Sequence, residues 1–338
     1  MTSDALLKVH GLKKQFPIRA GLFGFGGLTI DAVSDVSFEV MKGETLAIVG
    51  ESGCGKSTVG RCVLKLIEPT AGKIYLDGER IDGLRQRQLR PRRKKIQVVF
   101  QDPFSSLNPR MRIRDALAEP LENFRQTASR RETDARVDEL LRMVGLPPDC
   151  ADRWAHEFSG GQRQRIGIAR ALATNPQLVI CDEAVSALDV SVKAQIVNLL
   201  RKLQQETGIA FLFISHDLAI VENIAHRIAV MYLGKIVETA RTKDIISRPH
   251  HPYTRALLAA VPIPDPTRRR TNGVIQGEIP SATNPPTGCR FHTRCPFAFD
   301  RCRKEEPQLG DRGGDRFVAC HLPELPEMPA STPAVLSA

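Results

Sequence analysis

The sequence predicts an α/β fold built around a mostly parallel sheet. Short apolar runs bounded by turn residues recur at positions 45–49, 96–100, 178–181 and 210–214. Runs of this length and composition are typical of strands that are buried on both faces. Helical patterns lie between them, and in one of these the apolar residues are spaced to form a single stripe: Val192, Ile196, Leu199, Leu200 and Leu203. This alternation of strand and helix favours the α/β class.

Further elements divide the chain into regions. Residues from about 104 to 170 are expected to be mainly helical, and residues 228–238 to form a hairpin that closes the core. Prolines become frequent after residue 247. We therefore expect a large first domain at 5–247, a C-terminal region at 248–325 and a disordered tail at 326–338.

Composition limits the class of protein. The chain has 338 residues and a net charge of +10, without an apolar run long enough for a membrane helix or a secretory leader at its start. We expect a protein that stays in the cytoplasm and does not cross a membrane itself. The basic segment 85–95 is consistent with a solvated face, contact with anionic lipid or contact with nucleic acid. It lacks the aromatic residues that stack on bases, so nucleic acid is not an expected partner.

Residues 50–57 match the phosphate-binding pattern G-x-x-x-x-G-K-[ST], and they follow a predicted strand and open a predicted helix. Glycines let backbone N–H groups turn toward phosphates, and the helix N-terminus adds positive charge. Lys56 is expected to reach the outer phosphates and Ser57 to bind Mg²⁺. We assign ATP binding to Gly50, Glu51, Ser52, Gly53, Cys54, Gly55, Lys56, Ser57 and Thr58.

The predicted strand at 178–181 leads into two carboxylates, Asp182 and Glu183. In ATPases with this phosphate loop, an acid at this position completes the Mg²⁺ shell, a role that we assign to Asp182. Glu183 is then expected to act as general base toward the attacking water.

Residues 158–165 read Phe-Ser-Gly-Gly-Gln-Arg-Gln-Arg, and here the sequence resembles the ABC ATPase family. The resemblance implies a P-loop ABC ATPase fold with a RecA-like core, an antiparallel β subdomain and a helical subdomain. Its signature residues are Ser159, Gly160, Gly161 and Gln162. These residues also form a plain helix N-cap. In the family they bind the ATP of a neighbouring cassette, so hydrolysis requires a head-to-tail pair.

Other family motifs follow in order. Gln101 is similar to the Q-loop glutamine that senses Mg²⁺, Asp189 belongs to a D-loop, and His216 resembles the switch histidine that holds Glu183. Phe16 is either the aromatic residue that stacks on adenine or an ordinary core residue. The sequence departs from the family at Ala184, where proline is usual.

Two C-terminal stretches, 250–254 (His-His-Pro-Tyr-Thr) and 284–296, resemble the oligopeptide/dipeptide permease ATPases, and among these the second ATPase subunit. The resemblance implies a second ATPase subunit, two permease subunits and an extracytoplasmic binding protein as partners, at the cytoplasmic face of the inner membrane. The implied cargo is a di- or oligopeptide, or a nickel chelate, glutathione or opine. The chain lacks the fused cassettes or long coiled coil of ABC ATPases that act on DNA or ribosomes. The two C-terminal stretches argue against an exporter subunit. An inactive cassette would leave Lys56, Asp182, Glu183 and His216 unexplained.

Four of the eight cysteines cluster near the end of the chain: Cys289, Cys295, Cys302 and Cys320. Their spacing is poor for zinc, and the family resemblance implies a [4Fe-4S] cluster; zinc and unligated thiols are the alternatives. Cys54 lies inside the phosphate loop beside a helix N-terminus, so we expect a lowered thiol pKa and alkylation that ATP prevents.

Overall fold

The computed structural model describes residues 5–17, 29–102, 107–261 and 277–326. Most of the expected tail at 326–338 therefore lies outside the described residues. Within the described part, no helix is both long enough and apolar enough to cross a bilayer.

An eight-stranded sheet forms the centre of the molecule, in the order β11-β12-β10-β9-β3-β8-β7-β6. Its parallel strands are β9 (Arg227–Tyr232), β3 (Thr45–Val49), β8 (Ala210–Ser215), β7 (Leu178–Asp182) and β6 (Ile96–Val99). Strands β3, β7 and β8 are buried along their whole length, as their uninterrupted apolar runs predict. The hairpin predicted at 228–238 is confirmed, because β10 (Lys235–Arg241) pairs antiparallel with β9.

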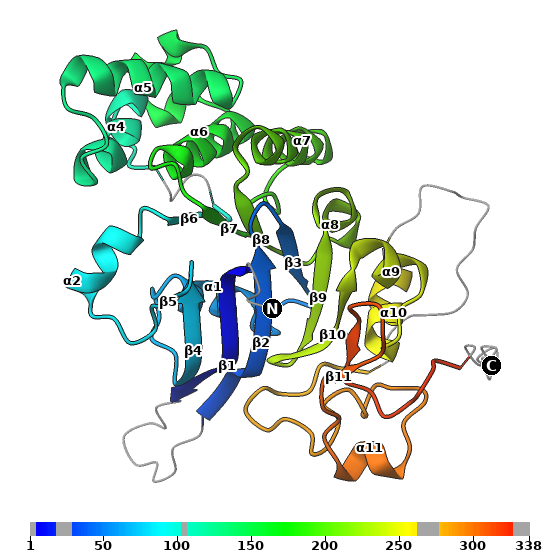
Figure 1. Cartoon of the computed structure of the whole chain (residues 1–338). Helices are drawn as coiled ribbons and strands as arrows, with labels where there is room; N and C mark the ends of the chain where they lie inside the picture. The colour runs from blue at the N-terminus through cyan, green and yellow to red at the C-terminus, as the bar shows by residue number, and fades with distance from the viewer. Residues whose placement is uncertain (1–4, 18–28, 103–106, 262–276, 327–338) are drawn as a thin grey trace, which may run out of the picture.

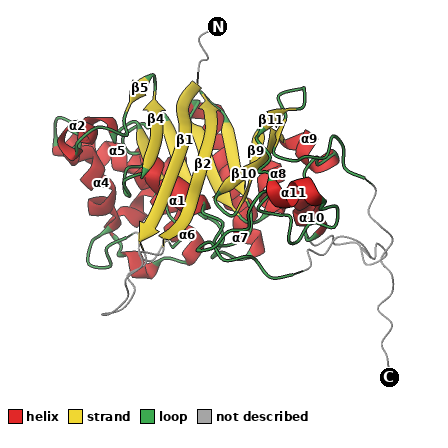
Figure 2. Ribbon diagram, turned by 90° about the horizontal axis from the view of Figure 1, so that it is seen from below, coloured by secondary structure: helices red, strands yellow, loops and turns green. Residues whose placement is uncertain are grey.

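A second sheet is antiparallel, in the order β2-β1-β4-β5, and Figure 2 shows its strands side by side. Its strands are β2 (Thr29–Met41), β1 (Ala5–Pro17), β4 (Ala71–Leu76) and β5 (Glu79–Arg80). Helix α1 (Lys56–Val63) contacts strands of both sheets, and its buried residues Val59, Cys62 and Val63 belong to the same apolar cluster as β1 and β2. The phosphate loop therefore starts a helix that is fixed between two sheets.

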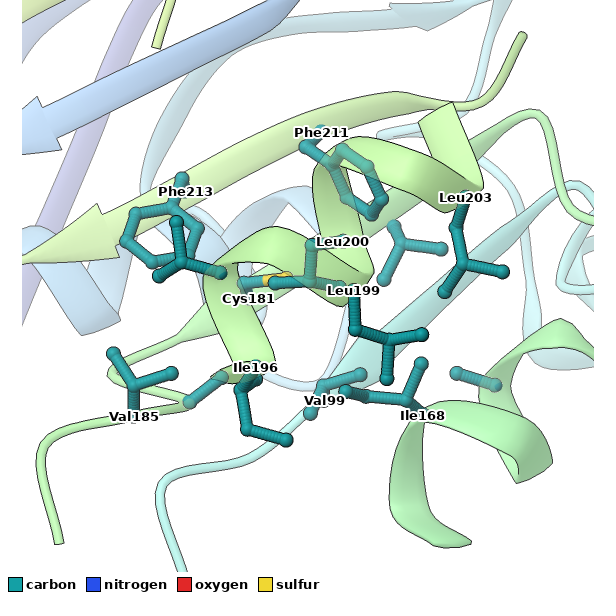
Figure 3. Close-up of a cluster of buried hydrophobic side chains, with 14 of the residues drawn as sticks. Val99, Ile168, Cys181, Val185, Ile196, Leu199, Leu200, Leu203, Phe211 and Phe213 are labelled. Carbon is teal, nitrogen blue, oxygen red and sulfur yellow. The ribbon is translucent and has the colours of Figure 1, made fainter. Parts of the chain in front are cut away.

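A second apolar cluster lies on the other face of the central sheet. Figure 3 shows Phe211 and Phe213 of β8 and Cys181 of β7 packed near α7 (Val190–Thr207). The predicted stripe of α7 is buried here, through Ile196, Leu199, Leu200 and Leu203. The expected helical segment is present as α4 (Ile113–Asn123), α5 (Arg130–Met143) and α6 (Gly160–Leu172), with 3-10 turns at Pro148–Asp152 and Ala155–Glu157.

The basic segment 85–95 forms the short helix α2 (Gln86–Leu89) and a 3-10 turn at Arg90–Arg92. Two of its charges are paired: Arg92 lies 2.7 Å from Glu79 and Lys95 lies 2.6 Å from Asp77. Exposed pairs of this kind add little stability. The solvated face therefore stays a prediction for this segment.

The C-terminal region packs beside the hairpin, at the opposite end of the molecule from α4 and α5 (Figures 1 and 2). Two helices, α8 (Leu218–Ile224) and α9 (Thr242–Ser247), come before this region in the chain. Its own elements are α10 (Pro252–Ala259), α11 (Asp300–Lys304), β11 (Gly310–Asp311) and β12 (Phe317–Val318). Because β12 pairs with β10, the last part of the described chain extends the central sheet. The region is therefore joined to the sheet that carries the phosphate loop.

Candidate active site

The phosphate loop turns tightly between β3 and α1. A Cβ atom on Gly50 would lie 2.1 Å from the carbonyl oxygen of Met231, and one on Gly55 would lie 2.1 Å from that of Ala32. Gly55 has φ +104 and is the N-cap of α1, and in the described part of the chain no side chain caps this helix start. Only glycine fits these two positions, and the α1 backbone N–H groups can accept an anion.

Lys56 is buried and its ammonium group points back into the loop. It donates hydrogen bonds to the carbonyl oxygens of Gly50 (2.8 Å) and Glu51 (2.9 Å). The loop borders a cavity of about 340 Å³. The predicted site residues that line it are Ser52, Gly53, Gly55, Lys56, Ser57, Thr58, Gln101 and Glu183. This places a buried cation, a helix N-terminus and a carboxylate around one space.

Ser57 and Asp182 meet beside this cavity. The Ser57 hydroxyl donates to Asp182 Oδ1 over 2.6 Å, and Asp182 ends strand β7. Burial raises the pKa of Asp182, although the hydrogen bond from Ser57 opposes this. A hydroxyl and a carboxylate side by side form the kind of oxygen donor set that Mg²⁺ prefers, so the residues fit this ion.

Glu183 follows at the carboxyl end of the same strand. Its φ of +50 is unusual for a residue other than glycine, and its N–H donates to the carbonyl of Ile214 over 3.0 Å. His216 Nδ1 lies 3.5 Å from Glu183 Oε1, because β7 and β8 are parallel neighbours. Unusual backbone conformations of this kind are held only by their surroundings and gather at functional sites. Glu183 is thus aimed into the cavity with His216 at its side.

The signature residues are not brought to this cavity by the described chain. Ser159 caps helix α6 by accepting from the Gln162 N–H (3.3 Å), and Gln162 accepts from the Ser159 N–H (3.0 Å). A Cβ atom on Gly161 would lie 2.6 Å from Val192, so the signature packs against the start of α7, whose N-cap is Asp189. Ser159, Gln162 and Asp189 are exposed and remain accessible to another chain.

Phe16 lies at the end of β1, where it pairs with Ile30 of β2. Ile30 lines the cavity, whereas Phe16 is not one of the described residues that do so. The ring of Phe16 is half-buried and carries the ammonium group of Lys14 at 4.9 Å. Its position near the edge of the site leaves adenine stacking as a prediction.

Several residues of the site lie outside the ATP-binding motifs of the sequence. Asp31, Ala32, Leu233, Gly234 and Ala282 contribute to the cavity wall. Arg294 and Tyr253, from the C-terminal region, both contact Glu51 of the phosphate loop. No local sequence signal marks these contacts, because the pairs are 202 and 243 residues apart in the chain.

The prediction of a [4Fe-4S] cluster at Cys289, Cys295, Cys302 and Cys320 is wrong. Within the described residues, which include all four, there is no group of three or more His, Cys, Asp or Glu side chains that could hold a metal ion. This excludes the zinc alternative as well. Burial raises the pKa of Cys289 to about 12 and that of Cys295 to about 11. Both pack against the second apolar cluster, the one that includes α7, so they are neutral structural thiols.

The expected lowering of the Cys54 pKa is also wrong. The side chain is 5% exposed, and burial raises its pKa more strongly than the neighbouring Lys56 lowers it. Cys54 Sγ would lie 2.9 Å from a Cβ atom on Gly50, so the thiol fills the inside of the loop. Its position in the phosphate loop is therefore a packing position.

Known proteins with similar sequences are ATP-binding subunits of transporters, which is consistent with a phosphate-binding site here. The family model described as "ABC transporter" matches residues 33–186, and the one described as "Oligopeptide/dipeptide transporter, C-terminal region" matches residues 237–302. The chain is 57% identical to the probable peptide ABC transporter ATP-binding protein y4tS of Sinorhizobium fredii, over 95% of this chain and 90% of that protein. It is 51% identical to the oligopeptide transport ATP-binding protein AppF of Bacillus subtilis, over 94% and 98%.

Among solved structures, the ATP-binding cassette MJ0796, as a dimer in a post-hydrolysis state bound to ADP and Pi, is similar with a TM-score of 0.62 and 31% identity. The match covers 70% of this chain and 98% of that cassette. The cassette fold is thus shared, and the remainder of this chain is additional to it. The motifs, the fold and these relatives together show that the chain belongs to the ATPases of ABC transporters, within the group that carries the oligopeptide/dipeptide transporter C-terminal region.

Proposed function

We propose that this chain is the ATP-hydrolysing subunit of an importer for di- and oligopeptides. One observation carries the proposal. Ser57 and Glu183 line one cavity, with Asp182 bonded to Ser57 and His216 beside Glu183, in a chain that also has the oligopeptide-type C-terminal region. The names of the relatives support peptides as the cargo class. Nickel chelates, glutathione and opines are alternative cargoes of related systems.

The site residues divide the chemistry between them. Lys56 and the N–H groups at the start of α1 bind the phosphates, and Ser57, Asp182 and Gln101 hold Mg²⁺, which supplies positive charge beside the phosphates when bound. Glu183 accepts a proton from the attacking water. His216 orients the Glu183 carboxylate, and the 3.5 Å separation leaves room for this contact to tighten when ATP is present.

Hydrolysis in this proposal needs a second cassette. The exposed start of α6, with Ser159, Gly160, Gly161 and Gln162, binds the ATP of a neighbouring ATPase subunit, and the neighbour's signature completes this chain's site. The region 5–247 is the ATPase domain and 248–325 the C-terminal region. The pair works under two permease subunits at the cytoplasmic face of the inner membrane, with an extracytoplasmic binding protein supplying cargo.

Reconstitution tests this proposal. The chain is purified with the permease, partner ATPase and binding-protein products of neighbouring genes, and ATP hydrolysis is measured in proteoliposomes. We expect binding protein loaded with a peptide to stimulate hydrolysis and peptide uptake, and the Glu183→Gln variant to abolish both. Stimulation by nickel chelates, glutathione or opines, without stimulation by a peptide panel, would replace the cargo class. Hydrolysis that no cargo changes would contradict the transport role.

A further inference from the structure

The C-terminal region reaches into the phosphate loop through Arg294. Its guanidinium group donates to both carboxylate oxygens of Glu51, over 2.8 Å from Nη1 and 3.0 Å from Nη2. The Arg294 side chain is only 5% exposed. A bidentate arginine–carboxylate contact is among the strongest hydrogen-bonded pairs that side chains make. Because the Arg294 side chain is buried, salt screens this pair less than it screens an exposed one. Glu51 is thus paired with a residue 243 positions further along the chain.

Tyr253 contacts the backbone of Glu51, whereas Arg294 contacts its side chain. The Glu51 N–H donates to the Tyr253 hydroxyl over 2.9 Å. Tyr253 is fully buried, and its ring packs against Tyr232 (centroids 4.6 Å apart) and Phe291 (5.4 Å). Tyr232 ends strand β9, and Phe291 belongs to the C-terminal region. The hydroxyl therefore has a fixed position relative to the central sheet.

Glu51 is also one of the two loop residues whose carbonyl oxygens hold the Lys56 ammonium group. Its carbonyl oxygen accepts from Lys56 Nζ over 2.9 Å, so the Glu51 peptide is held at its N–H, its side chain and its carbonyl. The Glu51 carboxylate is also a negative charge in a loop built to receive phosphates. Arg294 neutralises this charge, and its own pKa is raised by Glu51.

We propose that Arg294 and Tyr253 are positioning residues for ATP binding, which they support by fixing Glu51 and cancelling its charge. The C-terminal region is then part of the nucleotide site, and not merely an addition to the cassette. This goes beyond the proposed function and does not depend on it, because it concerns ATP binding by the chain whatever its cargo.

A charge-based role predicts a specific pattern among variants. In Arg294→Met the half-buried Glu51 carboxylate is left without its cation beside the phosphates, so Mg-ATP affinity is expected to fall about tenfold or more. In the double variant Glu51→Gln/Arg294→Met the repelling charge is gone, and affinity is expected to recover most of this loss. Tyr253→Phe removes the acceptor of the Glu51 N–H and is expected to weaken affinity about fivefold.

The test is equilibrium titration of the purified chain with a fluorescent ATP analogue and Mg²⁺, with thermal unfolding of each variant recorded in parallel. Arg301→Met is the matched control, since Arg301 pairs with Glu305 in the same region but both are exposed. Its affinity should not change. Recovery in the double variant supports the proposal. Unchanged affinity in Arg294→Met, or a loss that Glu51→Gln does not relieve, overturns it. If Arg294→Met does not fold, Arg294→Gln alone and with Glu51→Gln provides the same comparison, because glutamine also removes the charge.

Because the isolated chain is used, the result is independent of permeases and cargo. Failure of peptide-stimulated transport would leave this test unaffected. Conversely, normal ATP affinity in Arg294→Met would refute the positioning role without affecting the transport proposal.

Discussion

The Ser57 hydroxyl lies 2.6 Å from Asp182 Oδ1, joining the phosphate loop to the end of a strand 125 residues away. The sheet order brings them together, because β8 alone separates β3 from β7 and all three strands are parallel. The carboxyl ends of parallel strands lie at one edge, so loop and carboxylate share that edge. This is where α/β proteins commonly place their ligands.

We predict that Asp182→Asn raises the Mg²⁺ concentration needed for half-maximal ATP hydrolysis by about 100-fold or more, because it removes a charged oxygen beside Ser57. Binding of ATP without Mg²⁺ should change much less. The measurement is phosphate release against Mg²⁺ concentration. Asp152→Asn, which alters an exposed carboxylate paired with Arg114, is the control and should behave as the unaltered chain does. Equal Mg²⁺ dependence in the Asp182 and Asp152 variants would exclude the assigned role.

Glu183→Gln is expected to lower the hydrolysis rate about 10²- to 10⁴-fold while ATP still binds, since the amide cannot accept the proton of the attacking water. An ATP-bound pair of cassettes should accumulate, and size-exclusion chromatography with and without ATP would detect it. Glu222→Gln, on the exposed side of α8, serves as the control. Normal turnover by Glu183→Gln would show that another group is the base.

Much of this site could be predicted because its chemistry is local in sequence. The phosphate loop needs glycines, a lysine and a hydroxyl at fixed spacing, and Asp182 and Glu183 directly follow a buried strand. The pKa of a thiol in this loop could not be predicted in the same way, because it depends on burial. Cys54 lies beside a helix N-terminus, which lowers a thiol pKa, but desolvation outweighs that effect. The Glu51–Arg294 contact depends on packing between distant regions, for which no spacing rule exists.

The raised pKa of Cys54 leads to a prediction about its reactivity. The thiol is expected to stay protonated near pH 8 and to react with iodoacetamide far more slowly in the folded chain than in the unfolded one. Mass spectrometry of digested samples measures this, and Cys62, buried with a pKa of about 11, is an internal reference. Fast labelling of Cys54 that Mg-ATP prevents would contradict this interpretation.

His251 should make the stability of the chain depend on pH. It is buried and accepts the Tyr253 N–H, and burial lowers its pKa from 6.5 to about 3. The unfolded chain therefore binds a proton that the folded chain does not, so the free energy of unfolding falls as pH decreases below 6.5 toward 3. Between pH 6.5 and 5 this amounts to about 2 kcal/mol.

His251→Asn keeps a side-chain acceptor at the start of α10 without titrating in this range. The difference in urea unfolding between this variant and the unaltered chain, taken at pH 7 and pH 5, isolates the contribution of His251. A difference that does not change with pH would mean that His251 takes up its proton as readily in the folded chain as in the unfolded one, and would contradict the lowered pKa.

The last prediction concerns the buried pair that fastens the C-terminal region to the sheet. Glu238 is 0% exposed and accepts from the N–H groups of His250 and His251 and from Arg316 (3.0 Å). Arg316 also donates to the carbonyl of Asp244 over 2.9 Å. Arg316→Met leaves a buried carboxylate without its cation, so we expect a loss of about 3–5 kcal/mol in the free energy of unfolding.

Urea unfolding measures this loss, and Arg241→Met provides the matched comparison. Arg241 pairs with Asp315 at 3.1 Å on the same part of the sheet, but both side chains are about two-thirds exposed, so its loss should stay below about 1 kcal/mol. Glu238→Gln/Arg316→Met removes both charges and should be more stable than Arg316→Met alone. If the two single arginine variants lost equal stability, burial would not be the source of the effect, and the attachment of the C-terminal region would have to come from its aromatic contacts instead.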